Sequence, residues 1–224
     1  MAYKANLGSS TTTFASMMEN GFGIVTVMNA KIYEAMTAAD YASKTAYDIV
    51  NNPGTELCSL DTLKIANVTM EGPTKTVTGG RYSNPLIKFG KTARLEMQDA
   101  LGSSKAIEAL CGGTQEWSVV TTDTTTTDKL TGLHFGSNFV GPKMIIGDSF
   151  FIDRATGAQV PVKIVFYQFL PDSLFNLTQD AEGDATVFDM NGDLLTTEIK
   201  VGAEGTYGVF YSVVDPSEGK TASN

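Results

Sequence analysis

The sequence predicts a mainly β protein, a β-sandwich or barrel with one or two flanking α-helices, and three observations support this fold class. Beyond residue 113, short stretches of alternating or β-branched residues follow one another, separated by turn residues. Before that point, two long alternating stretches flank a polar loop. Spacing typical of helices occurs in only two segments. The length of 224 residues suits one such domain.

The two ends of the chain differ in composition from the middle. Residues 1–20 are small, polar and rich in hydroxyl groups, and residues 215–224 are polar again. We therefore expect extended terminal arms over these two ranges, with a single domain over residues 21–214 between them.

The first helical segment is expected over about residues 30–50. Apolar side chains such as Ile32, Met36 and Ile49 recur at helical spacing in an Ala-rich stretch, and the turn residues 51–54 end it. One helix, either continuous or broken near its middle, fits this pattern.

A long hairpin is expected next. Residues 57–70 are strand-like, with alternation over 63–70, and residues 86–97 form a second alternating stretch with one mostly apolar and one mostly polar face. The segment between them, about residues 72–85, is too long and too polar for a tight turn. It predicts a protruding loop at the end of the hairpin.

A short helix follows the hairpin. Ser103 or Ser104 is a suitable N-cap, and Gly112 supplies a left-handed C-terminal end. Ile107, Leu110 and Cys111 then share a face, which we expect to cover one side of the sheet.

The second half of the chain predicts strands almost throughout. The expected strands cover residues 117–121, 130–135, 140–146, 149–153, 160–169, 173–179, 186–190, 194–200 and 206–213, with a Thr-rich loop at 121–128. Residues 160–169 are apolar on both faces, so this strand is expected to be central or covered on both sides.

The charged residues and cysteines limit the possible functions. The formal net charge is −9, which argues against a protein that grips nucleic-acid phosphates. One histidine and two cysteines leave few groups for metal or nucleophilic chemistry. We expect no enzyme activity, no cofactor and no metal site. No stretch has the apolar length of a signal peptide or membrane span, so we expect no membrane contact and free thiols in a reducing cytoplasm.

Two local motifs are similar to motifs with known chemistry. Residues 147–150 read GDSF, similar to the nucleophile block of GDSL-type esterases, but His134 lies upstream and the C-terminal base of that family is absent. A plain turn is the favoured interpretation. The acidic clusters at 180–184 and 189–193 lack the glycine and glutamate spacing of a calcium loop, so a solvated acidic surface is favoured over a weak divalent site.

Three segments carry a resemblance to a known family: LKIANVTMEG at residues 63–72, FGKTARLEMQDALG at 89–102 and DAEGDATVFD at 180–189. With the polar arms, the long hairpin and the short helix after it, the chain resembles bacteriophage tail tube proteins, also called major tail proteins. The Ala-rich segment at 30–50 departs from that layout.

The resemblance implies a structural virion protein that assembles in the host cytoplasm into hexameric rings and stacks them into a homo-oligomeric tail tube. Its expected partners are copies of itself, the tape measure protein, the tail terminator, baseplate or tail-tip proteins and, in a contractile tail, the sheath protein. Double-stranded DNA would pass through the tube without specific binding.

Two groups of residues are candidates for such a role. For contacts between rings we expect the loop residues Gly72, Pro73, Thr74, Lys75, Thr76, Val77, Thr78, Gly79, Gly80, Arg81 and Tyr82, because a long polar loop gains order against a partner. Carboxylates repel DNA phosphates within the Debye length of about 8 Å. As carboxylates that line the channel we expect Glu96, Asp189 and Glu198.

Alternative interpretations remain open at this stage. A tail terminator, a head decoration protein and the inner tube of a contractile injection device have similar β architectures. A GDSL-type hydrolase acting through Ser149 and a carbohydrate-binding β-sandwich using Trp117 belong to other classes.

Overall fold

Two long strands, β10 (Lys143–Asp153) and β11 (Gln159–Pro171), form the centre of the fold in a computed structural model. The structure describes residues 14–20, 22–24, 29–61, 63–72, 74–76, 86–88, 90–99, 103–122, 125–137, 139–153, 157–172, 176–178, 187–201 and 205–216. Ile164 and Phe166 of β11 face one apolar core, and Val165 and Tyr167 face another. A strand buried on both faces reads as a continuous apolar run, so the prediction for residues 160–169 is confirmed.

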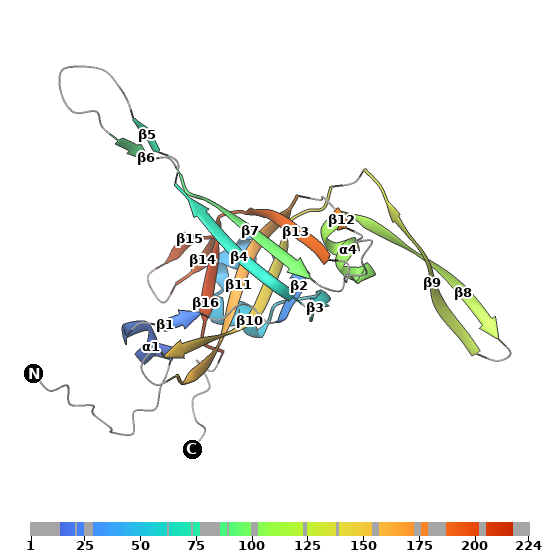
Figure 1. The fold of residues 1–224 in the computed structure, drawn as a ribbon, viewed down its shortest axis with the longest axis horizontal. Coiled ribbons are helices and arrows are strands. Elements are labelled where there is room, and N and C mark those ends of the chain that lie inside the picture. Colours follow the sequence, from blue (N-terminus) through green and yellow to red (C-terminus); the bar gives the residue numbers. More distant parts are fainter. Residues whose placement is uncertain are drawn as a thin grey trace, which may run out of the picture.

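An antiparallel sheet of ten strands is built around this pair (Figure 1). Its main path runs β3-β2-β10-β11-β13-β7-β4, while β1 pairs with β10, β12 with β13 and β16 with β11. The bounds of these further strands are β1 (Phe22–Ile24), β2 (Asn29–Glu34), β3 (Glu56–Leu60), β4 (Leu63–Glu71), β7 (Thr92–Asp99), β12 (Asn176–Thr178), β13 (Val187–Leu194) and β16 (Tyr211–Val214). The chain is therefore mainly β, as its sequence predicts.

The sheet folds over because β11 changes partners along its length. Residues Lys163 to Phe166 pair with β16, whereas Phe169 to Pro171 pair with β13. Figure 1 shows the β4–β7–β13 part crossing over the β2–β10–β11 part. The two parts enclose a core with helix α4 (Ser104–Cys111), and side chains of all these elements contribute to it: Ile32, Leu60, Leu95, Met97, Leu110, Ile145, Phe166, Phe169 and Leu194.

The predicted hairpin and the short helix are both found. Strand β4 pairs with β7, and beyond them β5 (Thr74–Thr76) pairs with β6 (Leu86–Lys88). The side chain of Ser103 accepts a hydrogen bond from the Ala106 N–H at 3.1 Å, and Gly112 ends α4 with φ 73°. The face of α4 differs in part from the prediction, because Ala106 and Ala109 are buried with Leu110.

A second core lies on the other face of β2, β10 and β11. Helices α2 (Ala38–Ser43) and α3 (Ala46–Asn51) cover it together with the small sheet of β14 (Thr197–Lys200) and β15 (Thr206–Val209). Tyr41 of α2 is fully buried, and its hydroxyl donates a hydrogen bond to the Tyr167 carbonyl oxygen at 2.6 Å. This bond fixes the helical layer to the centre of the sheet.

The expectation of a helix over residues 30–50 is wrong for its first third. Residues 29–34 form strand β2, and two short helices follow in place of one. Thr37 and Thr45 each cap a helix by accepting a hydrogen bond from the backbone N–H three residues later. These caps separate the segment into a strand, α2 and α3.

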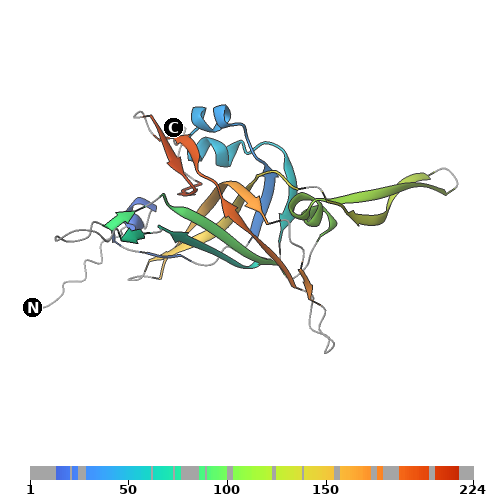
Figure 2. The ribbon, with the colours of Figure 1, turned by 90° about the horizontal axis from the view of Figure 1, so that it is seen from above.

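The Thr-rich stretch at 121–128 was expected to be a loop, but its described residues belong to strands. β8 (Gly113–Thr122) and β9 (Thr125–Phe135) form a separate two-stranded sheet that projects from the body in both views (Figures 1 and 2). Threonine is β-branched and favours extended backbone, which outweighs its polarity here. We call this hairpin the β8–β9 arm.

The N-terminal part also differs from the expected arm over residues 1–20. Residues Phe14–Asn20 form helix α1, whose Met17 is buried against Phe151 and Val162 in a third small core. Residues 1–13 lie outside the described part of the chain, as do residues 217–224 of the expected C-terminal arm.

The buried tyrosine pair gives a testable prediction about stability at high pH. Burial raises the pKa of Tyr41 and of Tyr167 to about 12, above the value of about 10 in an unfolded chain. Between pH 10 and 12 the unfolded chain loses these protons while the folded protein keeps them, so stability is present below pH 10 and falls as pH rises. Each tyrosine accounts for roughly 3 kcal/mol over this window.

Urea unfolding at pH 9, 10, 11 and 12 measures this effect. The Tyr41→Phe protein should start about 1–2 kcal/mol less stable, because the Tyr167 carbonyl loses its donor, and should then lose less stability with pH than the unaltered protein. Parallel pH profiles for the two proteins would contradict the assignment.

Candidate functional site

Strands β4, β7 and β13 form a surface with two unlike faces. In β7, Ala93, Leu95 and Met97 are buried in the main core, whereas Thr92 and Glu96 point outward and are exposed. The same alternation holds on both neighbours of β7. Among the residues whose side chains the structure describes, the outward ones across the three strands are polar: Asn67, Thr69, Glu71, Thr92, Arg94, Glu96, Gln98, Asp189, Asn191 and Asp193. We call this surface the polar face.

The polar face carries a negative charge. Four carboxylates lie on it, and a fifth, Asp172, follows β11 at its margin; the cation among its strand residues is Arg94. Arg94 binds Asp172 and also contacts Asp193, whose carboxylate oxygen lies 3.3 Å from a guanidinium nitrogen. The hydrogen bond with Asp172 raises the pKa of Arg94, so this cation stays charged. Arg94 also lies 4.0 Å from Glu96, and within the described part of the chain Glu71 and Asp189 form no ion pair.

A hollow of about 270 Å³ lies on the polar face, lined mainly by Thr69, Glu71, Thr92, Arg94 and Glu96. Its lining residues are polar or charged except for Ala93. Beside it, Asp189 accepts a hydrogen bond from the Gln98 amide at 3.1 Å. These groups are suited to hold a layer of water and cations against the sheet, because exposed charges keep their hydration.

The polar face ends at a strand edge. Within the described residues β4 has a paired strand, β7, on one side only, and the other side of its nine residues is an open edge. An open strand presents N–H and C=O groups that pair readily with another chain. This edge is therefore a place where a second molecule can add to the sheet.

The structure separates the three carboxylates that were expected to line a channel. Glu96 and Asp189 lie on the polar face, on neighbouring strands β7 and β13. Glu198 does not lie there, because β14 belongs to the small sheet over the helical layer. Asp193, Asp172 and Glu71 were missed. The sequence could have predicted Asp193, because it lies four residues after Asp189 in one strand and therefore shares its face.

The loop residues expected at ring contacts are only partly described. Gly72 is exposed, and Thr74, Lys75 and Thr76 form β5 at the far end of the hairpin. The other candidates, Pro73, Val77, Thr78, Gly79, Gly80, Arg81 and Tyr82, lie outside the described residues.

The interpretation of residues 147–150 as a turn is wrong, and the structure gives the esterase hypothesis little support. Gly147 and Ser149 lie inside strand β10, where Gly147 pairs with Ala30 on one side and with Ile164 on the other. Ser149 is 1% exposed, so a substrate has no direct access to it. His134 lies on the β8–β9 arm, where its Nε2 is 2.7 Å from a Glu116 carboxylate oxygen.

Among the residues that the structure describes, no three His, Cys, Asp or Glu side chains are grouped as a metal site would require. In the same part of the chain no helix has the length and apolar character needed to cross a membrane.

Comparison with known proteins gives no further assignment. Models of known protein families do not match the chain, and a search of curated proteins finds no match either. The polar face and the open edge therefore carry the functional argument.

Proposed function

We propose that this protein is the subunit of a bacteriophage tail tube, which forms hexameric rings and stacks them around a channel for the viral genome. The observation that carries the proposal is the polar face of β4, β7 and β13, whose reverse side forms the main core. A sheet with one buried apolar face and one wet acidic face is suited to line a water-filled channel.

Ring formation would also account for the open edge of β4. In the described part of the chain, one side of the nine-residue strand β4 is unpaired, and natural proteins usually shorten, cover or pair such a long edge. Pairing with the next copy continues the sheet around the ring and removes the edge. The function then resides in assembly, without bond-making chemistry.

The charge of the polar face fits the passage of DNA. Glu96, Asp189 and Asp193 would face the channel, and carboxylates repel phosphates within about 8 Å at physiological salt. DNA therefore slides without adhering. In this role the chain belongs to the virion tail, with the tape measure protein, tail terminator and baseplate or tail-tip proteins as partners.

Negative-stain electron microscopy of the purified protein across a concentration series tests the proposal. We expect long hollow tubes with a regular axial repeat above a threshold concentration, because rings must form before they stack. Isolated rings that never stack would instead favour a tail terminator or another ring-forming virion part. A protein that remains monomeric at all concentrations, and also when expressed with the partners named above, would refute the proposal.

A further inference from the structure

The β8–β9 arm has little support from the rest of the molecule. Its two strands pair with each other and form a sheet of their own, and helix α4 contacts the arm near its base. With 10 residues in β8, the arm is about 33 Å long. A lone two-stranded hairpin is marginally stable in water and gains stability when a further layer covers it.

One face of the arm is apolar. Cross-strand partners share a face, and a bulge between Glu116 and Trp117 does not change which residues lie together. The apolar face carries Trp117, Val119, Leu130, Leu133 and Phe135, together with the polar residues Gln115, Thr121, Thr126 and Asp128. Trp117 is 54% exposed and Val119 67% exposed. The opposite face carries Glu116, Ser118, Val120, Lys129 and His134. Asp128 is thus the one charged residue among the described residues of the apolar face.

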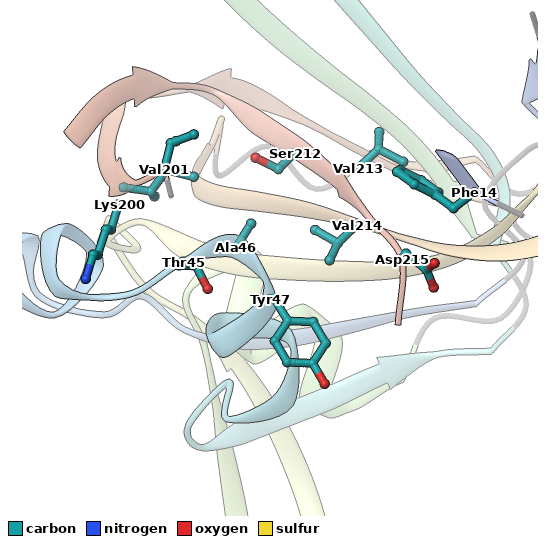
Figure 3. A pocket seen from close by; sticks show the side chains of 11 residues that line it. Phe14, Thr45, Ala46, Tyr47, Lys200, Val201, Ser212, Val213, Val214 and Asp215 are labelled. Atoms are coloured by element: carbon teal, nitrogen blue, oxygen red, sulfur yellow. The ribbon is translucent and has the colours of Figure 1, made fainter. Parts of the chain in front are cut away.

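A groove with apolar walls lies on the body, between α3, β14 and β16. Its volume is about 530 Å³, and its walls include Ala46, Ile199, Lys200, Val201, Val213 and Val214. Figure 3 shows Lys200 at one end of the groove and Asp215 at the other. Val201, at the rim, is 45% exposed.

The arm and the groove lie at different ends of the molecule. In Figures 1 and 2 the arm points away from the body on the side of α4 and β3, whereas β14, β16 and α1 lie on the opposite side. The arm of one molecule therefore cannot reach its own groove. A second copy can supply the missing layer to each of them.

We infer that the apolar face of the β8–β9 arm docks in the groove between α3, β14 and β16 of the neighbouring copy, with Asp128 beside Lys200. The charges support this pairing, because the single carboxylate of the apolar face lies near the far end of the arm and Lys200 lies at one end of the groove. The inference deepens the proposed function by naming the contact between subunits, and it rests on the self-assembly in that proposal.

A head-to-tail contact of this kind is suited to make rings. Each copy gives one arm and receives another, and such heterologous contacts close into a ring when the rotation between copies permits. One face of a two-stranded hairpin is expected to bury less area than a standard interface of about 1,600 Å². A single contact is therefore weak, whereas a closed ring holds every subunit twice.

A charge-exchange experiment tests the pairing by sedimentation velocity across a concentration series. Asp128→Lys and Lys200→Asp should each raise the concentration needed for assembly at least tenfold, because like charges then meet. Combining both changes should restore assembly to within about threefold of the unaltered protein. Lys129→Asp is the matched control, since Lys129 follows Asp128 directly and lies on the other face of the arm. Failure of the double variant to recover would overturn the pairing of Asp128 with Lys200.

A second pair of variants tests the apolar contact. Val119→Asp should prevent assembly, whereas Val120→Asp, one residue later on the opposite face, should leave it within about threefold. Near-ultraviolet and far-ultraviolet circular dichroism of the two variants separates loss of docking from loss of fold. Equal effects of the two changes would overturn the inference.

Cross-linking between two different variants locates the contact. Cys58 and Cys111 are first replaced by Ala, and Val119→Cys protein is then mixed with Val201→Cys protein and oxidised. A disulfide-linked heterodimer is expected, and the same arm variant mixed with Asp61→Cys protein should give none. If the unaltered protein forms tubes, but the charge variants assemble as well as it does and no cross-link forms, this inference is refuted and the proposed function remains. Lack of any assembly by the unaltered protein would refute both.

Discussion

A Gly192→Ala protein is expected to lose about 3 kcal/mol of its free energy of unfolding, near the upper end of overpacking effects. Gly192 lies in β13 opposite Pro171 of β11 and Leu95 of β7, where the two parts of the sheet meet. An added Cβ would lie 2.3 Å from the Leu170 carbonyl oxygen and 2.7 Å from the nearest atom of the Phe169 ring.

The strands cannot move apart easily to relieve this clash, because β13 pairs with strands on both sides. Urea unfolding at neutral pH measures the loss, and Gly141→Ala serves as the matched control. A Cβ at Gly141 meets nothing within 4 Å, so that change should stay within about 0.5 kcal/mol. Equal stability of the two variants would mean that β11 and β13 are not in such close contact.

An Asp189→Lys protein is expected to form particles that retain DNA. Asp189 is exposed on the polar face, and its replacement by lysine changes the charge by two units in every subunit of the proposed ring. Lysine ammonium groups that neutralise phosphates release counterions, which favours binding at low salt. We expect affinity for a duplex of about 30 base pairs to rise at least tenfold at 50 mM salt and to fall steeply toward 200 mM.

Assembly in the presence of labelled duplex, followed by co-sedimentation, measures this gain. Glu108→Lys is the control, because Glu108 is exposed on α4, away from the polar face, and undergoes the same change of charge. Both variants should assemble alike. If the Glu108 variant retains as much DNA as the Asp189 variant, the polar face does not line the channel.

The features that the sequence predicts correctly are those decided by local signals. Alternation over residues 92–99 sets the two faces of β7, and the Ser103 cap with Gly112 sets both ends of α4. The central place of β11 also follows locally, because its apolar residues occur on both faces.

The features that it misses depend on contacts between distant segments. Residues 29–34 alternate over too short a stretch to exclude a helix, and their pairing with β3 and β10 makes them a strand. The threonines near residue 121 are extended because β8 and β9 pair with each other. In the first case tertiary pairing overrides a weak local preference, and in the second it reinforces the β preference of threonine.

The same distinction applies to the candidate site. Glu96 and Asp189 come together because alternation places both outward and because β7 pairs with β13. Glu198 alternates in the same way within β14, but its strand pairs with β15 in another sheet. Alternation tells which side of a strand a residue occupies, whereas the topology decides which surface that side becomes.

The change of partners along β11 has a mechanical consequence. Strand β11 belongs to both parts of the sheet. A force on the β4–β7–β13 part is therefore carried through Phe169 and Pro171 into β11, whose other residues pack against the helical layer. Sliding of one layer over the other would require breaking the ladders of β11. Each subunit should therefore respond to load as a stiff plate, and a filament made of such plates would bend at the joints between copies.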